Sequence, residues 1–389
     1  MRYRYNKDKS VQLLSERGVS FKEIAQAIDN GNIVRIGEHH NKERYPNQKI
    51  MYVELLEKIY VVPYIKEADG SLFLKTIYHS SKIQKLLSND QASRITKAAH
   101  LLSSGNIVAF PTETVYGLGA DATSDEACAK IYQLKGRASN NPLIVHVPSI
   151  EEAREIAVFN QQAETLATKF WPGPLTFVLP LKRDAKISKI VTAGLNTIAI
   201  RIPSHEIALE LIRATGKPIA APSANPSGYV SPTTTNHVLS NFPDLYVIEG
   251  SNSEYGLEST IIDLTGKPTI LRYGFITPES LSKALCEEVV YNHGYEYIKA
   301  PGMMAKHYSP RAHVRLNATE LQDGEMGIGF GEIDFDLNLS KAGDLVEAAA
   351  NLFDMLQKLD KQTKAIAIGP IPDKGIGLAI NDRLRRAGA

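Results

Sequence analysis

The stretch that decides the fold is IVAFPTETVYGLGADATSDEACAKIYQLKGRASNNPLIVHV, which runs from Ile107 to Val147. It begins with a short apolar run, Ile107–Phe110, which predicts a buried strand, and the polar segment Pro111–Thr114 ends that strand. A helix is predicted from the N-cap residue Ser124 to Gly136, and a second apolar strand follows over residues 143–147. Strand, helix and strand in succession indicate an α/β domain.

The polar residues of this stretch gather where its strands and its helix end. Thr112 and Thr114 follow the first strand, and Lys135 and Arg137 stand at the end of the helix, directly before the second strand. Cations beside hydroxyl groups bind phosphate and carboxylate groups well. The stretch therefore predicts a binding site for a polyanion.

The composition bounds the rest of the chain. A chain of 389 residues is longer than one ordinary hydrophobic core and indicates two or three domains. No apolar run is long enough to cross a bilayer and the N-terminus lacks the apolar core of a signal peptide, so we expect a cytoplasmic protein with no membrane partner. The two cysteines, Cys128 and Cys286, are too few for a disulfide framework or a zinc finger, and we expect both to be reduced and buried.

Residues 1–90 differ in charge from the remainder. They hold 15 Lys and Arg against 11 Asp and Glu, a net charge of +4, whereas the rest of the chain has a net charge of −3. A capping-box pattern from Ser20 predicts a helix, and three β-rich runs at 50–55, 59–65 and 72–78 predict an antiparallel sheet. These elements make a small α+β module. Its basic bias favours RNA or an acidic protein as a partner, and a solvated basic surface explains it equally well.

The order of these elements, together with HHNKERYPNQKI from His39 and the later FLKTIYHSSK, resembles small toxins of bacterial toxin–antitoxin pairs with a ribonuclease-like fold. Such toxins use basic and histidine side chains to activate a ribose hydroxyl group and to stabilise the cleaved phosphate. The resemblance implies RNA or an antitoxin as the contact of this module. The alternative, an inactive or purely protein-binding module, stays open. The candidate residues are His39, His40, Arg44, Lys75 and His79.

A domain boundary is predicted near residue 90, where the polar segment SNDQASR precedes an amphipathic helix from Ile95. Strands and helices alternate over residues 91–285, which predicts an α/β domain with a mixed sheet. Polar residues recur at the strand ends of this domain, namely Arg201, Ser223, Asn225, Ser259 and Arg272. Each one alone is explained by an exposed arginine or a turn, but together they offer cations and hydroxyl groups to one anionic substrate. No Walker A sequence is present, so a nucleotide would be held without a glycine-rich loop.

Seven motifs of this domain, in this order, are FPTETVYGLG, KGR, NPLIVHV, WPGPLT, IAIRIP, APSAN and LRYG. They resemble the threonylcarbamoyl-AMP synthases of the YrdC-like family. The resemblance implies a twisted open mixed sheet with a large, positively charged cavity. It also implies a nucleotidyltransferase that converts L-threonine, bicarbonate and ATP into threonylcarbamoyl-AMP and pyrophosphate. The product would pass to partner proteins that modify the adenosine beside the anticodon of tRNA.

The same resemblance assigns residues of this sequence to each substrate. Lys135 and Arg137 are implied as catalytic groups that stabilise negative charge on the phosphates, acting with Arg272. Magnesium is expected with ATP, although no carboxylate cluster suggests a dedicated metal site. The residues implied around L-threonine are Thr114, His146, Arg201, Ala221 and Ser259. Those implied around ATP are Arg137, Asn141, Thr197, Ser223, Ser231 and Arg272.

Residues 286–311 predict an irregular linker because they contain KAPGMMAKHYSPR, which is rich in Pro and Gly. The HYSP motif resembles the linker of the longer, two-domain form of the family, which implies that the linker lies across the cavity and that Tyr308 contacts ATP. A passive tether is the alternative. Residues 312–389 predict strand, helix and strand, and they resemble the small Rossmann-like C-terminal domain of that form. We expect this domain to support a lid or to offer a docking surface.

Two other functions compete with the synthase. A carbamoyl transferase of hydrogenase maturation shares the fold family, but its upstream zinc fingers need more than two cysteines. A protein that binds double-stranded RNA or the ribosome would use the positive cavity without a tyrosine-bearing linker. A third possibility is a ribonuclease toxin fused to the synthase, with tRNA as the common target.

Overall fold

The computed structural model describes residues 3–30, 32–38, 45–56, 58–291 and 307–388. The chain divides into two compact units, of which the first ends at Arg94 and also includes residues 250–252. The division falls within one continuous helix, α3 (Ser81–Ser103). The helix that the sequence predicts from Ile95 thus begins earlier, because the polar segment SNDQASR is helical as well. The boundary at residue 90 and the further domain limits stay predictions.

The first unit is α+β, with a six-stranded sheet in the order β1-β5-β4-β3-β2 and β6 paired with β4. Helix α2 begins at a complete Ser20–Glu23 capping box and buries Phe21 and Ile24 in the core of this unit. The sequence patterns missed β1, α1 and β2 and merged β5 with β6. The predicted antiparallel pairing is confirmed for β3, β4 and β5, but β1 pairs parallel with β5. The elements are β1 (Tyr3–Arg4), α1 (Lys7–Arg17), α2 (Phe21–Asp29), β2 (Ile33–Glu38), β3 (Lys49–Leu55), β4 (Lys58–Lys66), β5 (Leu72–Leu74) and β6 (Tyr78–His79).

The candidate ribonuclease residues of this unit are only partly described. His39, His40 and Arg44 lie outside the described residues. The Lys75 amine lies over the Phe73 ring, 4.3 Å from its centre, and His79 Nδ1 is 3.2 Å from the Ile59 carbonyl oxygen. A ribonuclease activity of this unit stays a prediction.

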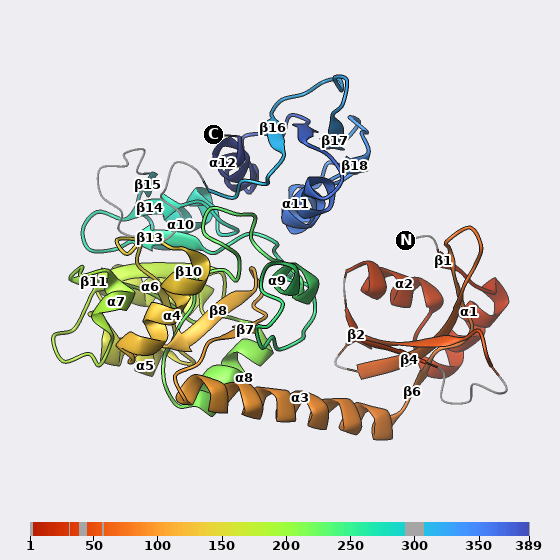
Figure 1. Cartoon of the computed structure of the whole chain (residues 1–389), viewed down its shortest axis with the longest axis horizontal. Coiled ribbons are helices and arrows are strands. Elements are labelled where there is room, and N and C mark those ends of the chain that lie inside the picture. The colour runs from red at the N-terminus through yellow and green to blue at the C-terminus, as the bar shows by residue number, and fades with distance from the viewer. Residues whose placement is uncertain (1–2, 31, 39–44, 57, 292–306, 389) are drawn as a thin grey trace. The chain divides into compact units, whose positions relative to one another are not determined.

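The second unit contains a nine-stranded mixed sheet in the order β15-β14-β13-β10-β11-β9-β12-β8-β7, with helices on the sheet (Figure 1), as the sequence predicts. Parallel pairs join β9 to β11, β10 to β13 and β14 to β15, and the other neighbours are antiparallel. The strands are β7 (Val108–Phe110), β8 (Gly117–Asp121), β9 (Ile144–His146), β10 (Leu175–Pro180), β11 (Thr197–Arg201), β12 (Ile219–Ala220), β13 (Thr260–Asp263), β14 (Thr269–Arg272) and β15 (Val290–Tyr291). The helices are α4 (Asp125–Lys135), α5 (Ile150–Ile156), α6 (Gln161–Phe170), α7 (Lys189–Thr192), α8 (Glu206–Thr215), α9 (Thr235–Asn241) and α10 (Pro278–Leu285).

The sequence patterns did not predict strand β8, which lies inside the opening stretch. They predict a polar turn between Phe110 and Ser124, but residues 117–119 pair antiparallel with β7, and Ala120 and Asp121 pair antiparallel with β12. Glycine weakens a strand pattern, yet here it is required, since a Cβ at Gly119 would lie 2.8 Å from the Phe110 ring. The helix after it is confirmed, with Ser124 as its N-cap and Gly136 as its left-handed C-cap.

The C-terminal part has a four-stranded, fully parallel sheet in the order β16-β19-β17-β18. Its buried residues form one hydrophobic cluster with Val115, Val230 and Leu257 of the preceding domain, so the two parts share a core. The sequence predicted β17, α11 and β19 but not β16, β18 and α12. The elements are β16 (His313–Arg315), β17 (Met326–Gly329), β18 (Leu337–Asn338), α11 (Leu345–Asp360), β19 (Ala365–Ile368) and α12 (Gly377–Ala387).

Both cysteines are free thiols. The prediction that both are buried is wrong for Cys286. Cys128 is buried on α4, and burial raises the pKa of its thiol to about 12, which makes it a poor nucleophile. Cys286 is exposed because it is the left-handed C-cap residue of α10 and lies beyond the apolar face of that helix. None of the helices in the described residues has the length and apolar content needed to span a membrane.

Candidate active site

A cavity opens where β9, β11 and β14 end and where β13 begins. Arg201 and His146 are register partners in the parallel pair of β11 and β9, which places them side by side on its wall. Eight of the residues assigned from the sequence to a substrate or to catalysis line this cavity together, namely Thr114, Arg137, His146, Arg201, Ala221, Ser223, Ser259 and Arg272, and Thr112 of the polar segment lines it as well.

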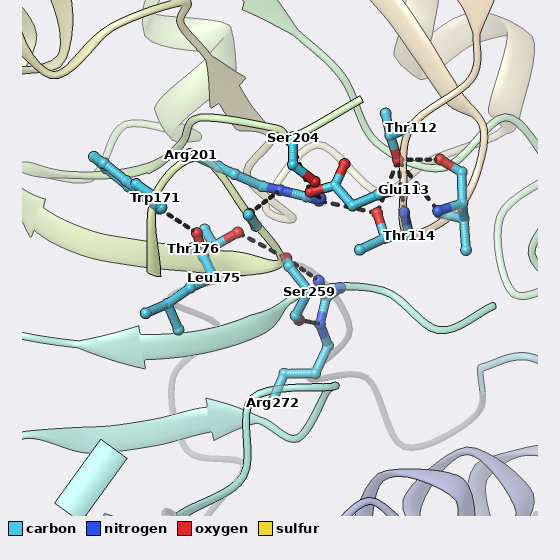
Figure 2. Close-up of polar contacts among 12 residues, drawn as sticks. Thr112, Glu113, Thr114, Trp171, Leu175, Thr176, Arg201, Ser204, Ser259 and Arg272 are labelled. Carbon is cyan, nitrogen blue, oxygen red and sulfur yellow. Dashed lines mark hydrogen bonds and ion pairs between the residues drawn. The ribbon is translucent and has the colours of Figure 1, made fainter. Parts of the chain in front are cut away.

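Arg201 is the centre of the hydrogen-bond network in Figure 2. Its side chain is nearly fully buried and donates to Glu113 Oε1 at 2.6 Å, to Thr114 Oγ1 at 3.0 Å and to the Gly173 carbonyl oxygen at 3.1 Å. Glu113 Oε1 also accepts from the Ser204 backbone N–H at 3.0 Å. A guanidinium group has five N–H donors. Arg201 therefore keeps two N–H groups beyond these contacts, enough for a bidentate bond to a carboxylate.

Glu113 balances the charge of Arg201. Burial opposes ionisation of this carboxyl group, but the Arg201 charge and the hydrogen bonds together outweigh burial and hold the pKa of Glu113 below its usual value. Both charges are thus present at neutral pH. Breaking such a buried pair is costly because the remaining charge loses its partner.

Arg137 also lines the cavity, is buried, and has a different set of hydrogen-bond partners from Arg201. Its guanidinium donates to Asn141 Oδ1 at 2.6 Å, to the Asn141 carbonyl oxygen at 3.0 Å and to the Pro142 carbonyl oxygen at 2.7 Å. Burial, aided by the like charge of Arg272, lowers the pKa of Arg137 to about 10, so the group remains charged at pH 7. No carboxylate among the described residues forms an ion pair with Arg137, and the cavity wall thus carries an uncompensated positive charge.

Arg272 is held by Ser259, the residue directly before β13, which pairs antiparallel with β14. Its Nε donates to the Ser259 carbonyl oxygen at 3.0 Å and its Nη2 to Ser259 Oγ at 3.1 Å (Figure 2). The glycine of the LRYG motif makes this approach possible, because a Cβ at Gly274 would lie 2.3 Å from the Thr260 nitrogen. Burial also lowers the pKa of Arg272. Three buried arginines thus converge on one cavity.

Lys135 is not on the cavity wall, although the sequence placed it at the anion site. Its amine is buried and donates to the carbonyl oxygens of Ser223, at 2.6 Å, and Asn225. Burial lowers the pKa of Lys135 well below its ordinary value. The lysine holds the APSAN turn in place, and Ser223 of that turn lines the cavity.

A second buried network connects the cavity to the C-terminal helix α12. Glu258, which lines the cavity, accepts a hydrogen bond from Ser231 Oγ on one oxygen and from Arg383 Nε at 3.0 Å on the other. Arg383 is fully buried, and its guanidinium lies 4.9 Å from the centre of the Tyr308 ring. Tyr308 packs against Phe353 of α11, and its hydroxyl group has no hydrogen-bond partner among the described residues.

Some predicted residues are therefore set back from the cavity. Two of them, Asn141 and Ser231, are hydrogen-bonded to residues of the cavity wall. Tyr308 belongs to the network behind the wall, and its neighbour His307 lines the cavity itself. Thr197 stands at the opposite end of β11 from Arg201 and is not a lining residue. The proposed substrate contacts of Asn141, Ser231, Tyr308 and Thr197 remain predictions.

Sequence reasoning missed Glu113, Glu258 and Arg383. The first two lie inside quoted or neighbouring motifs, as the carboxylate of FPTET and the residue before Ser259. Pairing with an arginine 88 or 125 residues away is not visible in one sequence. A buried network of long-range ion pairs appears only once the fold is known.

His146 is buried on the cavity wall, and its Nδ1 has no hydrogen-bond partner among the described residues. Burial, with the nearby charge of Arg201, lowers the pKa of His146 from 6.5 to about 3. The unfolded chain therefore binds a proton at His146 below pH 6.5 that the folded chain does not bind. The stability linked to His146 is fully present above pH 6.5 and is lost as the pH falls toward about 3.

We expect His146→Gln to reduce the acid sensitivity of the fold. As the pH falls from 6.5 to 5, the free energy of unfolding should decrease less steeply in the variant than in the parent chain, with a difference in slope that rises to about 1.4 kcal/mol per pH unit. Urea unfolding at several pH values measures this slope, and His100→Gln, at an exposed histidine, is the matched control. Equal slopes in the parent chain and in His146→Gln would contradict the assignment.

The fold and the cavity define an α/β protein with a site for anionic groups. Two family models match this chain. One, described as "Telomere recombination" (Sua5_yciO_yrdC), covers residues 100–274, and the other, "Threonylcarbamoyl-AMP synthase, C-terminal domain", covers residues 276–389.

Relatives that cover about three-quarters of this chain agree with these models. The threonylcarbamoyl-AMP synthase of Pyrococcus abyssi is 41% identical over 321 residues, covering 76% of this chain and 94% of that protein. The threonylcarbamoyl-AMP synthase of Bacillus subtilis is 39% identical, covering 78% and 94%. The crystal structure of P. abyssi Sua5 complexed with L-threonine matches with a TM-score of 0.68 at 37% identity, covering 76% of this chain and 94% of that chain. The chain belongs to the threonylcarbamoyl-AMP synthase family and is an enzyme, which confirms the resemblance seen in the sequence.

Proposed function

We propose that the protein is a nucleotidyltransferase that makes threonylcarbamoyl-AMP and pyrophosphate from L-threonine, bicarbonate and ATP. The observation that carries this proposal is Arg137, a buried cation on the cavity wall whose hydrogen-bond acceptors are neutral oxygens. A buried charge is costly until an opposite charge compensates it. A polyphosphate bound in the cavity supplies that charge, and Arg272 lies close enough to Arg137 for each to act on the other.

The threonine subsite is best placed at the other end of the cavity. The two N–H groups that Arg201 retains suit the threonine carboxylate, and Thr114, His146, Ala221 and Ser259 line the same wall. The P. abyssi relative was crystallised with L-threonine, which supports the same ligand class here. We assign ATP to the side of Arg137, Asn141, Ser223, Ser231, Arg272 and Tyr308, with Thr197 as a more distant candidate.

The chemistry suits such a site. Condensation of the threonine amine with bicarbonate releases water and gives a carbamate, one oxygen of which attacks the α-phosphorus of ATP as pyrophosphate leaves. A carbamate decays in water, so an enclosed site is needed to keep the reactants together. Negative charge grows on the phosphoryl oxygens and on pyrophosphate, and Arg137 and Arg272 stabilise it. Lys135 supports the reaction by holding Ser223 at the cavity wall.

The magnesium ion of the proposed reaction is expected to come with ATP. The described residues contain no group of three or more His, Cys, Asp or Glu side chains that would bind a metal ion, and Glu258 has both oxygens engaged. These side chains do not fit a resident magnesium site, and we expect Mg²⁺ to arrive bound to ATP. We also expect the adenylate to pass, in the cytoplasm, to partner proteins that modify tRNA.

The test is pyrophosphate release by the purified chain from MgATP, with and without L-threonine and bicarbonate. We expect release to require both, and Arg137→Ala to lower it by about 100-fold or more, the effect of losing one preorganised charge-stabilising group. Arg213→Ala, at an exposed arginine of α8, is the matched control and should retain full activity. Release without threonine, or equal activity in both variants, would contradict the proposal.

A further inference from the structure

A second cavity, of about 250 Å³, lies at the carboxyl ends of two neighbouring parallel strands of the C-terminal sheet. Asn317 follows β16 closely, and Ile371 and Asp373 follow β19. The remaining wall is helix α12, which contributes Asn381 and Arg385 from one face, four residues apart. No residue of this wall lines the catalytic cavity.

The position of this cavity is one at which open α/β sheets bind ligands. In such sheets, ligands bind outside the carboxyl ends of the strands, between the loops that leave them. Here the chain leaving β16 leads to β17, on the far side of β19, whereas the chain leaving β19 enters α12. The cavity lies between these two connections. Its volume is below the range of about 300–1,000 Å³ that suits drug-sized ligands, so its occupant is small.

The wall combines both signs of charge with an apolar surface. Arg385 is exposed, and its guanidinium has no hydrogen-bond or ion-pair partner within the described ranges. Asp373 is exposed and accepts from Asn381 Nδ2 at 3.1 Å, a bond that fixes the loop after β19 because the same amide donates to the Ile371 carbonyl oxygen at 3.1 Å. Leu316 and Leu384 complete the apolar part.

We propose that this cavity binds a free α-amino acid. Its carboxylate would meet Arg385, its ammonium group Asp373, and its side chain the apolar surface made by Leu316, Ile371 and Leu384. A simple carboxylic acid or a simple amine would satisfy only one of the two charged groups. The proposal concerns a ligand that is bound and not consumed, and it does not depend on the catalytic reaction.

This site shares helix α12 with the catalytic cavity. Arg383, two residues before Arg385, donates to Glu258 of the catalytic cavity and to the carbonyl oxygen of Tyr273 at 2.7 Å. Burial, with the charges of Tyr291, Asp382 and Asp373 and against the opposing charge of Arg385, raises the pKa of Tyr273 to about 12. The charged groups of the second cavity therefore lie close to the residue that follows Arg272. An amino acid bound here contacts the helix that holds Glu258.

Isothermal titration of the full chain with each of the twenty L-amino acids tests the proposal. We expect at least one of them to bind with an affinity that Asp373→Asn and Arg385→Gln each weaken about tenfold or more, as expected for loss of a charged hydrogen bond. Asp323→Asn, at an exposed aspartate of the same domain, is the matched control and should leave the affinity unchanged. Removing the amino or the carboxyl group from the ligand should weaken binding to a similar extent.

Two outcomes would overturn the proposal. One is that every affinity in the panel is the same in the parent chain and in both variants. The other is that the deaminated ligand binds as well as the amino acid, which would make the cavity a site for simple anions. Both variants lie at exposed positions, and unchanged pyrophosphate release confirms that they fold. L-Threonine is included in the panel, and its binding at the catalytic cavity is separated by its insensitivity to Asp373→Asn.

Discussion

Replacement of Arg201 with methionine is expected to lower kcat/KM for L-threonine by about 100-fold or more. Truncating one partner of a buried, hydrogen-bonded charge pair costs about 2–5 kcal/mol, and 1.4 kcal/mol corresponds to a factor of ten. Methionine preserves much of the apolar volume of arginine but donates no hydrogen bond to a carboxylate. Steady-state pyrophosphate release at varied threonine concentration measures the change.

The same substitution should also destabilise the fold, because Glu113 would remain buried without its partner. We expect a loss of about 3–5 kcal/mol in the free energy of unfolding. The double variant Arg201→Met/Glu113→Gln removes both charges and should recover most of this stability while activity stays low. The two readouts thus separate the structural role of Arg201 from its contact with threonine.

The matched control is Arg154→Met. Arg154 makes a similar two-point pair with Glu164, at 3.1 and 2.6 Å, but on the surface, where both side chains are at least a third exposed. Exposed pairs contribute about 0–1 kcal/mol, so neither stability nor activity should change much. Full activity in the double variant of Arg201 would refute the threonine subsite, and equal stability losses for Arg201 and Arg154 would refute the buried pair.

The predicted site was recoverable from sequence where local signals agree with the fold. Arg137 follows a helix that has a clear N-cap and a glycine C-cap, and Arg201 and Arg272 end strands with strongly apolar patterns. Strand ends of one sheet meet at an edge, so eight of the chosen residues line one cavity. The strand-end and helix-end residues Arg137, Arg201 and Arg272 needed only the alternation of apolar strands and helices, whereas His146 and Ala221 were chosen through the family resemblance.

The parts that escaped prediction depend on contacts between distant segments. Lys135 was expected to face the anion, but the APSAN turn engages its amine, and no local pattern shows that contact. Strand β8 was hidden because Gly117 and Gly119 are poor strand formers whose value lies in the room they leave for Phe110. Helix α12 is short of apolar residues because much of its buried surface is charged, including Arg383. Patterns of hydrophobicity do not detect a helix that is buried through ion pairs.

Arg383 is therefore the residue through which we expect the C-terminal domain to affect catalysis. We predict that Arg383→Gln raises the KM for ATP about tenfold or more, as expected when a buried charged hydrogen bond is lost, and leaves L-threonine affinity nearly unchanged. The reason is that Arg383 orients Glu258 and, through it, Ser231, while its guanidinium lies over the Tyr308 ring. These are residues of the proposed ATP side, and none of them contacts Arg201.

The effect must be distinguished from simple destabilisation of the C-terminal domain. Arg315→Gln is the matched control, because Arg315 also pairs with a carboxylate of this domain, Glu325, at 2.6 and 2.8 Å, but does so away from the cavity. Arg315→Gln should leave the KM values for ATP and L-threonine unchanged.

A double-mutant cycle decides whether Arg383 acts through Glu258. If it does, Glu258→Gln and Arg383→Gln should be strongly non-additive in KM for ATP, with a coupling energy of about 0.5–3 kcal/mol. Additive effects, or equal changes in the KM values for ATP and threonine, would mean that Arg383 only stabilises the domain. Non-additivity would make helix α12 part of the ATP site, since the carboxylate that holds Ser231 then depends on a side chain 125 residues further along the chain.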